Sequence, residues 1–356
     1  MAWENVMVVQ PEGVRWPAEW EPHRATWLSW PHQKADWPGK FGPIAWVWAE
    51  IVRLVSRDES VELFVPEGAE KAIRGILDKA GADLKVVNLH PQPTNRVWMR
   101  DAGGIFVKDP KDRKTLLDWR FNAWAKYEDW QLDDALPQAM AKIRGLAKAR
   151  IIQPKQGKNR IVLEGGSIEG NGAGVLLTTR ECLLSKIQER NPGLDQAAYE
   201  SVFKQYLGIS KVIWLDRGIE GDDTHGHVDD LARFVGPERI VLVQERDKTL
   251  PNYEPLRENA EILKRQKMPS GKPLEVISLP MPRPVVFRGQ VLPASYANYI
   301  LTNGSVLVPT FNDEADRKAL GILADCFPGR KVIGIHAVDL VWGLGTLHCL
   351  SQQEPE

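Results

Sequence analysis

A repeated unit constrains the fold of this chain more than any other feature. A helix-forming stretch followed by a short Val- and Ile-rich run, typical of a β-strand, recurs five times. Unusual polar residues recur in step with it, because Asp101, Glu164 and His227 are separated by 63 residues each time. Such a period predicts similar units closed around an axis. The five expected pairs of helix and strand are 68–80 with 84–89, 131–149 with 149–154, 195–208 with 211–216, 254–267 with 274–280, and 314–327 with 331–336.

Closure around an axis would bring together four polar residues that lie far apart in the sequence. Asp101, Glu164, His227 and Cys349 each follow a strand-forming run by 12 to 14 residues. Equivalent positions in radially repeated units meet near the axis, so we expect these side chains to converge. We therefore predict an α/β fold in which residues 1–356 form a single closed domain. Two ordinary α/β domains are the alternative, because alternating helices and strands fit both arrangements.

Composition excludes several classes of function. The net charge of −1 leaves no basic excess for binding nucleic acid or an anionic membrane. No apolar run is long enough to span a bilayer, and residues 1–13 lack the pattern of a signal peptide. The three cysteines are too few for a disulfide scaffold, which suits a reducing cytoplasm. These features predict a cytoplasmic protein, and they leave assembly into a homo-oligomer open.

Cys349 is the cysteine with the strongest sign of chemistry. Cys182 and Cys326 have apolar helical neighbours and are interpreted as small buried core residues. The glycines of 343–345 allow the close backbone approach that catalytic loops need. His348 is adjacent, but neighbours in an extended strand point to opposite faces, so the base for this thiol must come from elsewhere.

The DDTHGHVDD segment supplies a candidate base. In an extended segment His225, His227 and Asp229 would share one face. Two histidines with a carboxylate could instead hold a borderline metal cation, which makes a metal-dependent hydrolase a rival hypothesis. A solvated loop is the third interpretation. The metal hypothesis leaves the thiol of Cys349 without a role.

Two further motifs, RDAGG and EGG, each place a carboxylate at the expected end of an apolar strand, directly before two glycines. Together the motifs describe a pocket with three carboxylates, an imidazole and a thiol, contributed by Asp101, Glu164, His227, Asp229 and Cys349. Such a pocket attracts a cation. Carboxylates also match a planar guanidinium, from which they accept paired hydrogen bonds.

The motifs resemble those of one known family, and the match runs from residue 18 to the C-terminus. They are similar to the agmatine deiminase family, which is related to bacterial peptidylarginine deiminase within the guanidine-modifying (pentein) superfamily. The resemblance implies a five-unit α/β propeller with pseudo-fivefold symmetry. The motifs that carry it are AEWEPHRATWLSWP, WMRDAGGIFV, LEGGSIEGNG, TTRECLLS, ERNPGL, GDDTHGHVDD, ASYANYILTNG and LHCLSQQEP.

The resemblance also implies a role for each candidate residue. Cys349 matches the nucleophile, His227 the general acid and base, and Glu164 the carboxylate that orients this histidine. Asp101 and Asp229 match the carboxylates that hold the guanidinium. The residue at the position of the neighbouring aromatic ring is Trp98. No metal and no organic cofactor is implied.

The implied reaction is hydrolytic deimination of a guanidine through a covalent cysteine intermediate. Agmatine is the favoured substrate, giving N-carbamoylputrescine and ammonia in putrescine and polyamine biosynthesis. The alternatives are a peptidylarginine deiminase that produces citrulline, and a guanidine-binding protein that has lost catalysis. The chain departs from the family pattern at 31–39, Gly104, His225 and 343–347. We expect these positions beside the pocket, where they would affect the substrate's tail.

Overall fold

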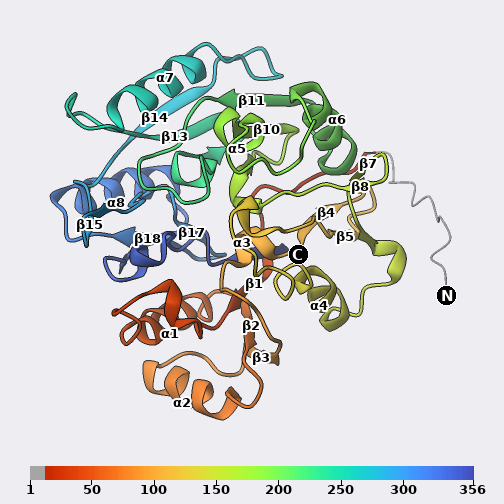
Figure 1. Ribbon diagram of the computed structural model, residues 1–356, viewed down its shortest axis with the longest axis vertical. Helices are drawn as coiled ribbons and strands as arrows, with labels where there is room; N and C mark the ends of the chain where they lie inside the picture. Colours follow the sequence, from red (N-terminus) through yellow and green to blue (C-terminus); the bar gives the residue numbers. More distant parts are fainter. Residues whose placement is uncertain (1–12) are drawn as a thin grey trace.

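Five sheets surround the centre of the molecule in the computed structural model, which describes residues 13–356 (Figure 1). The stretch tested for a signal peptide lies, up to residue 12, outside the described residues. The first sheet contains β20 (Gln352–Pro355), β1 (His23–Ser29), β2 (Ser60–Val65) and β3 (Val87–Pro91). The next two contain β4 (Ile105–Lys108), β5 (Lys114–Leu117) and β6 (Ile151–Ile152), then β9 (Ile168–Gly170), β10 (Val175–Thr179) and β11 (Lys211–Leu215). The last two contain β12 (Ala232–Gly236), β13 (Arg239–Gln244) and β14 (Glu275–Pro280), then β17 (Ile300–Leu301), β18 (Ser305–Thr310) and β19 (Lys331–His336).

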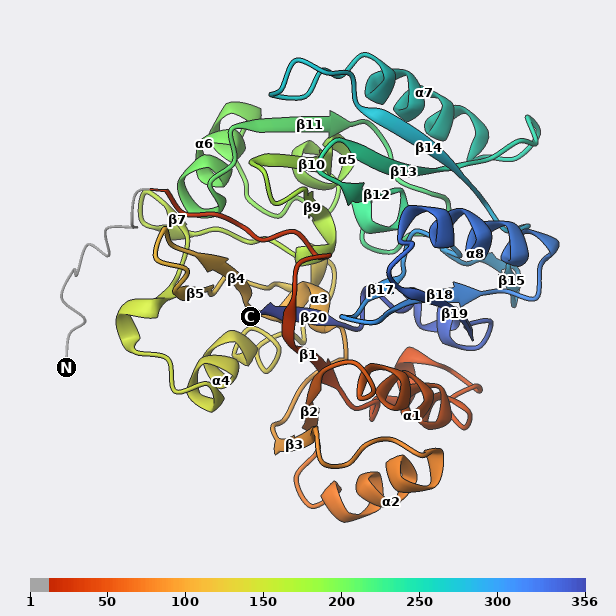
Figure 2. The ribbon, with the colours of Figure 1, turned by 180° about the vertical axis from the view of Figure 1, so that it is seen from behind.

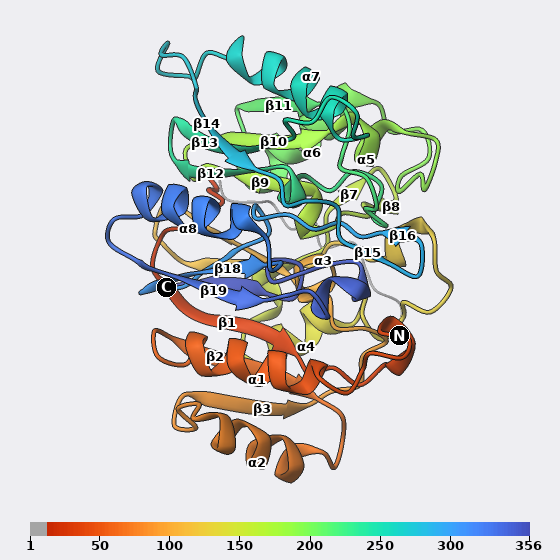
Figure 3. The same cartoon turned by 90° about the vertical axis from the view of Figure 1, so that its left-hand side faces the viewer.

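The sheets share one pairing pattern. In the last four, the first pair of strands is antiparallel and the second pair is parallel, with a helix in the connection. The helices lie at the periphery, and α7, α8, α1 and α2 follow one another down the molecule in side view (Figures 1 and 3). They are α1 (Ile44–Val55), α2 (Glu70–Ala80), α4 (Leu136–Ile143), α6 (Gln196–Leu207), α7 (Tyr253–Lys264) and α8 (Glu314–Cys326). Two small hairpins lie outside the five sheets. They are β7 (Lys155–Gln156) with β8 (Asn159–Arg160), and β15 (Val286–Phe287) with β16 (Gln290–Val291).

The two ends of the described chain meet in the first sheet. Strand β20 pairs antiparallel with β1, with Trp27 opposite Gln352, while β1 pairs parallel with β2 (Figure 2). The C-terminal segment therefore completes the sheet that the N-terminal segment begins. Among residues 13–356, none of the helices has the length and apolarity needed to cross a bilayer.

Short helical turns at the centre of the molecule place the regularly spaced polar residues near one another. The turns α3 (Met99–Ala102), η4 (Gly165–Ser167) and η5 (Val228–Asp230) precede the first strands of three consecutive sheets. Neighbouring turns contact each other, α3 with η4 and η4 with η5, and α3 lies at the hub of the ribbon (Figure 1). The predicted strand ends at RDAGG and EGG are therefore wrong. Because the chain must bend sharply towards the axis, it forms a helical turn at each of these points.

Each of the five predicted helix and strand pairs is present. The strand expected over 84–89 is displaced to Val87–Pro91, and one pair is much shorter than predicted. The helix expected over 131–149 is shortened to α4, because Pro137 occupies its first turn and Gly145, with φ of +62°, follows its end. The strand expected over 149–154 is reduced to the two residues of β6.

Candidate active site

Cys349 lies on a turn directly before β20, and its side chain is almost completely buried. Its sulfur accepts a hydrogen bond from Asn298 Nδ2 at 3.1 Å. Glycine is needed at 345, because a Cβ there would lie 2.7 Å from Trp98 Cζ3 and 3.3 Å from Cys349 Cβ. The chain here is a turn and not the predicted strand, so the face argument about His348 is wrong.

The surroundings of Cys349 disfavour its ionised form. Its Sγ is 3.7 Å from Asp229 Oδ2. Burial, together with the charges of Asp229, Asp230 and Asp101, raises the pKa of the Cys349 thiol well above its usual range. The cysteine is therefore held as a neutral thiol at neutral pH.

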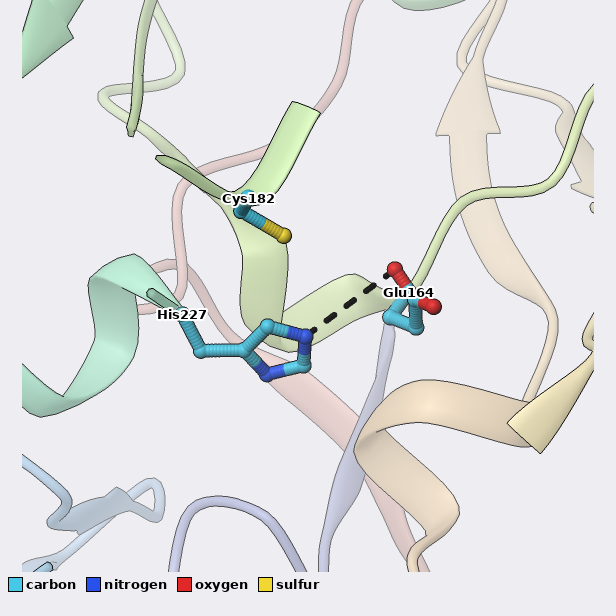
Figure 4. Close-up of side chains that lie close together, drawn as sticks. All are labelled: Glu164, Cys182 and His227. Carbon is cyan, nitrogen blue, oxygen red and sulfur yellow. Dashed lines mark ion pairs between the residues drawn. The ribbon is translucent and has the colours of Figure 1, made fainter. Parts of the chain in front are cut away.

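His227 begins the η5 turn and is buried, with 1% of its surface exposed. Its Nδ1 is 3.7 Å from Asp101 Oδ1, and its Nε2 is 3.9 Å from Glu164 Oε2 (Figure 4). Burial alone would lower the pKa of this imidazole. The charge of Asp101 and the polar contacts with Cys182 and Glu164 outweigh burial and raise the pKa of His227 well above 6.5, so the ring is protonated at neutral pH.

Glu164 is held in its charged form by a buried arginine. Arg190 Nε donates to Glu164 Oε1 at 2.9 Å, and both side chains are inaccessible to solvent. Burial opposes the charge, but Arg190 and His227 outweigh it and lower the pKa of Glu164 to about 2. Arg190 comes from the ERNPGL motif, for which no role was predicted from the sequence.

Cys182 lies on α5 (Arg180–Leu184) and its sulfur points towards the space between His227 and Glu164 (Figure 4). The three side chains present a nitrogen, an oxygen and a sulfur that all lie within 4.8 Å of one another. Cys182 belongs to the smaller hydrophobic core, as predicted, but it also contacts the imidazole. Its apolar neighbours in the sequence concealed this second contact.

Asp101, on α3, is fixed by donors on both carboxylate oxygens. Trp124 Nε1 donates to Oδ2 at 2.9 Å and the backbone N–H of Gly166 donates to Oδ1 at 3.1 Å. Burial, reinforced by Asp229 and Glu164 and opposed by His227, raises the pKa of Asp101 to about 6. It is therefore mainly ionised at neutral pH.

Asp229 is held in place by His348. His348 Nδ1 is 2.7 Å from Asp229 Oδ2, and its Nε2 is 2.7 Å from Glu19 Oε1. Burial would raise the pKa of Asp229, but the hydrogen bond with His348 outweighs burial and lowers it. Since both His348 nitrogens are occupied, this histidine is not free to act as a base for Cys349.

Behind Asp229 lies a cluster that we call the Glu19 network, formed by Glu19, Arg100, Glu169, Arg233 and His348. Arg233 pairs with Glu19 and, at 3.1 Å, with Glu169, and it donates to the carbonyls of Ala297 and Tyr299 at 3.0 Å. Arg100 pairs with Glu19 at 3.1 Å. Burial and the charges of Arg100 and Arg233 lower the pKa of His348.

Four buried polar atoms around the centre make no hydrogen bond: Nδ1 and Nε2 of His227, Oδ1 of Asp229 and Oε2 of Glu164. Gly166 leaves room beside them, because a Cβ there would lie 2.6 Å from His227 Nδ1 and 2.9 Å from Asp101 Oδ1. Buried polar groups are normally paired, so unpaired ones gathered around a gap indicate a polar ligand.

A cavity of about 320 Å³ opens onto Cys349 and Asp101, a volume at the small end of the range for ligand pockets. The rings of Trp98 and Trp124 line it. Two of the sequence departures line it as well, through Ala35, Asp36 and Pro38 and through Gly343 and Leu344. Gly104 does not, because it packs against Leu116.

The ligand set of the metal hypothesis is not assembled. His225 adopts φ of +64°, and its Nε2 lies 3.1 Å from Ser185 Oγ instead of joining His227. Asp222 accepts from the backbone N–H groups of Gly226 and His227, and this turn separates the two rings. Among residues 13–356, the groups with metal-ligand spacing are Glu164 with Cys182 and His227, Glu19 with Glu169 and His348, and Asp229 with Asp230 and Cys349. An arginine already neutralises a carboxylate in each of the first two groups.

The structure brings the six predicted site residues to one centre. Trp98, Asp101 and Cys349 line the cavity. His227 lies within 4 Å of Asp101 and Glu164, and Asp229 lies 3.7 Å from the Cys349 sulfur. Sequence reasoning missed Asn298, Arg190, Cys182 and Trp124. The ASYANYILTNG, ERNPGL and TTRECLLS motifs contained the first three, and only their similarity to known motifs could have marked them.

Comparison with known proteins places this architecture in a family. The model of the Porphyromonas-type peptidyl-arginine deiminases matches residues 15–355. This chain belongs to that family. Agmatine deiminase of Pseudomonas aeruginosa (strain LESB58) is 33% identical, over 97% of this chain and 96% of its own length.

Solved structures of similar proteins agree with this assignment. Agmatine deiminase of Enterococcus faecalis, determined while catalysing its reaction, is 30% identical with a TM-score of 0.88, and the match covers 97% of this chain and 96% of that one. A cysteine-to-serine variant of the C. jejuni agmatine deiminase, with substrate bound, is 30% identical with a TM-score of 0.86 over 96% of each chain. The predicted fold class, a five-unit α/β propeller of the pentein type, is confirmed.

Proposed function

We propose that this protein is an agmatine deiminase, a hydrolase that converts agmatine and water to N-carbamoylputrescine and ammonia. Relatives of that activity match the chain over nearly its full length. We further propose that residues 1–356 act as one catalytic domain in the cytoplasm, without a metal or an organic cofactor.

The observation that carries the proposal is the set of unpaired polar atoms beside a buried thiol. Asp229 Oδ1 lacks a partner, and Asp101 is an ionised carboxylate at the same centre. A planar guanidinium presents several N–H donors around one electrophilic carbon, so it can pair with both carboxylates while its carbon faces the sulfur. A neutral ligand would leave the charge of these carboxylates uncompensated, and an anionic ligand would be repelled by them.

Substrate binding activates the nucleophile in this mechanism. The resting thiol of Cys349 has a raised pKa because anionic groups surround it. A bound guanidinium offsets these charges and lowers the pKa, so the thiol releases its proton to water in the cavity when the substrate binds. The thiolate then forms a bond to the central guanidinium carbon.

His227 moves protons in both halves of the reaction. The protonated imidazole gives its proton to the departing nitrogen, the C–N bond breaks, ammonia leaves, and an S-alkylthiouronium remains on Cys349. The neutral imidazole then takes a proton from water, whose oxygen attacks the same carbon. The C–S bond breaks, the proton of the added hydroxyl passes to the leaving sulfur to restore the thiol, and the ureido product leaves. Glu164, which is held by Arg190, stabilises the protonated form of His227.

The direct test is formation of the ureido product by the purified protein. Agmatine, free arginine and an arginine peptide are offered to the wild type and to Cys349→Ser. We expect turnover of agmatine, lost in the variant, because serine is a much weaker nucleophile at the same position. Turnover of the peptide in preference to agmatine would make the protein a peptidylarginine deiminase. Activity retained by Cys349→Ser would contradict the mechanism.

A further inference from the structure

One charged side chain in the cavity has no role in the chemistry described above. Asp36 ends the short turn η1 (Lys34–Asp36), in the loop where the sequence departs from the family pattern, and it lines the same cavity as Cys349. Among residues 13–356, its carboxylate makes no hydrogen bond and no ion pair. Its Oδ2 is shielded from solvent and unpaired. A half-buried carboxylate without a partner is costly unless a ligand satisfies it.

The other charged groups near the mouth of the cavity are already paired. Arg96 donates to the backbone oxygen of Asp129 at 2.7 Å and to its Oδ1 at 2.8 Å, and it stacks 4.6 Å from the centre of the Tyr127 ring. Asp223 pairs with Lys126 and accepts from the Tyr127 hydroxyl at 2.7 Å. Of the charged side chains Asp36, Arg96 and Asp223 that line this part of the cavity, Asp36 is therefore the one without a partner, and its charge is negative.

We infer that Asp36 is the subsite for the primary ammonium group at the tail of the substrate. The inference rests on the proposed function, because agmatine carries a guanidinium at one end and an ammonium at the other. The carboxylates beside Cys349 take the first cation and Asp36 takes the second. The rings of Trp98, Trp124 and Trp342 line the cavity and suit the methylene chain that joins the two charges.

The same arrangement disfavours free arginine. Its α-carboxylate would meet the negative charge of Asp36. Arg96 is the one cationic residue lining the described cavity, and its guanidinium is occupied by Asp129. Burial of Asp36, only partly offset by Arg96, raises the pKa of its carboxyl to about 6, so it is mainly ionised at neutral pH and ready to pair with an ammonium.

The test combines a substitution with a change of substrate. Wild type, Asp36→Asn and the matched control Asp223→Asn are assayed with agmatine and with butylguanidine, which has the same guanidine but no ammonium. Because Asp36→Asn loses one charge-assisted contact, we expect it to raise KM for agmatine roughly 10- to 100-fold with little change in kcat. KM for butylguanidine should stay within about twofold, since this substrate makes no such contact. In the wild type, KM for agmatine should be lower than KM for butylguanidine by about the same factor by which Asp36→Asn raises KM for agmatine.

Several outcomes would overturn the inference. An equal loss for both substrates would show that Asp36 shapes the loop, and a selective loss in Asp223→Asn would move the ammonium subsite to that residue. Asp36→Ser serves as a second variant if the asparagine form does not fold. A wild type that turns over neither substrate would overturn the proposed function as well. Agmatine turnover that is unchanged in Asp36→Asn would overturn this inference alone.

Discussion

Two buried polar clusters share the centre of this molecule and differ in how completely they are paired. In the Glu19 network, none of the buried polar side-chain atoms lacks a hydrogen-bond partner. Around His227, four buried polar atoms lack one. His348 links the two clusters, because it contacts Glu19 on one side and Asp229 on the other.

This difference in hydrogen bonding indicates which cluster stabilises the fold and which takes part in the reaction. A fully paired buried network fixes the positions of its members and is costly to break. Unpaired groups weaken the folded state and persist where a ligand satisfies them. The Glu19 network therefore holds Asp229 and the β20 segment in place, while the His227 side is left open to react.

The largest expected effect is on the reactive side. In His227→Gln, we expect turnover of agmatine to fall roughly 10²- to 10⁴-fold, because the acid and base of both half-reactions is lost. The unfolding midpoint should remain close to that of the wild type, since neither ring nitrogen makes a conventional hydrogen bond. Steady-state assays and thermal unfolding measure the two quantities. A variant that unfolds far earlier would erase the distinction between the clusters.

The opposite pattern is expected in the Glu19 network. Arg233→Met leaves the buried carboxylates of Glu19 and Glu169 without their main cation, which should cost about 3–5 kcal/mol of stability. The control Arg217→Met removes an exposed pair with Glu258 and should cost less than about 1 kcal/mol. Urea unfolding compares them. Equal losses would mean that the network does not stabilise the fold.

The variant Gly166→Ala tests the open side of this comparison, because it fills the gap beside His227 without removing a polar group. A methyl group at this position would displace His227 and Asp101, and a misplacement of about 1 Å can cost about 10²-fold in rate. The control is Gly75→Ala in α2, where a Cβ meets no atom within 4 Å and should raise stability. If Gly166→Ala kept wild-type turnover, the gap would not be the binding site.

The smallest effect concerns Cys182. In Cys182→Ala the imidazolium loses a polar neighbour that raises its pKa, so the pKa of His227 falls and activity above neutral pH declines, by roughly two- to tenfold. The pH profile should lose its high-pH side first, because His227 must be protonated to release ammonia. Cys326→Ala, a buried cysteine in α8, is the matched control. Identical profiles for both variants would limit Cys182 to packing.

The sequence predicted the order of the elements and the convergence of its polar residues. Both follow from the period of 63 residues, which records a repeated unit and so a shared direction towards the axis. The five helix and strand pairs were readable because apolar periodicity reports directly on burial.

Local geometry at the centre could not be predicted in the same way. The sequence suggested strands at RDAGG, EGG and DDTHGHVDD, but the chain forms helical turns, and Gly226 with φ of +97° reverses the direction between His225 and His227. Nor did any pattern mark Arg190 as the partner of Glu164 or Asn298 as the partner of Cys349. These contacts join distant parts of the chain, and apolar spacing carries no information about them.

The most direct test of the account asks which sulfur carries the reaction. The wild type is quenched with acid during turnover of agmatine, digested, and analysed by mass spectrometry. The account predicts an amidino adduct of the substrate on the peptide that contains Cys349, and an unmodified peptide around Cys182. An adduct on Cys182, or sustained turnover with no adduct on either cysteine, would contradict it.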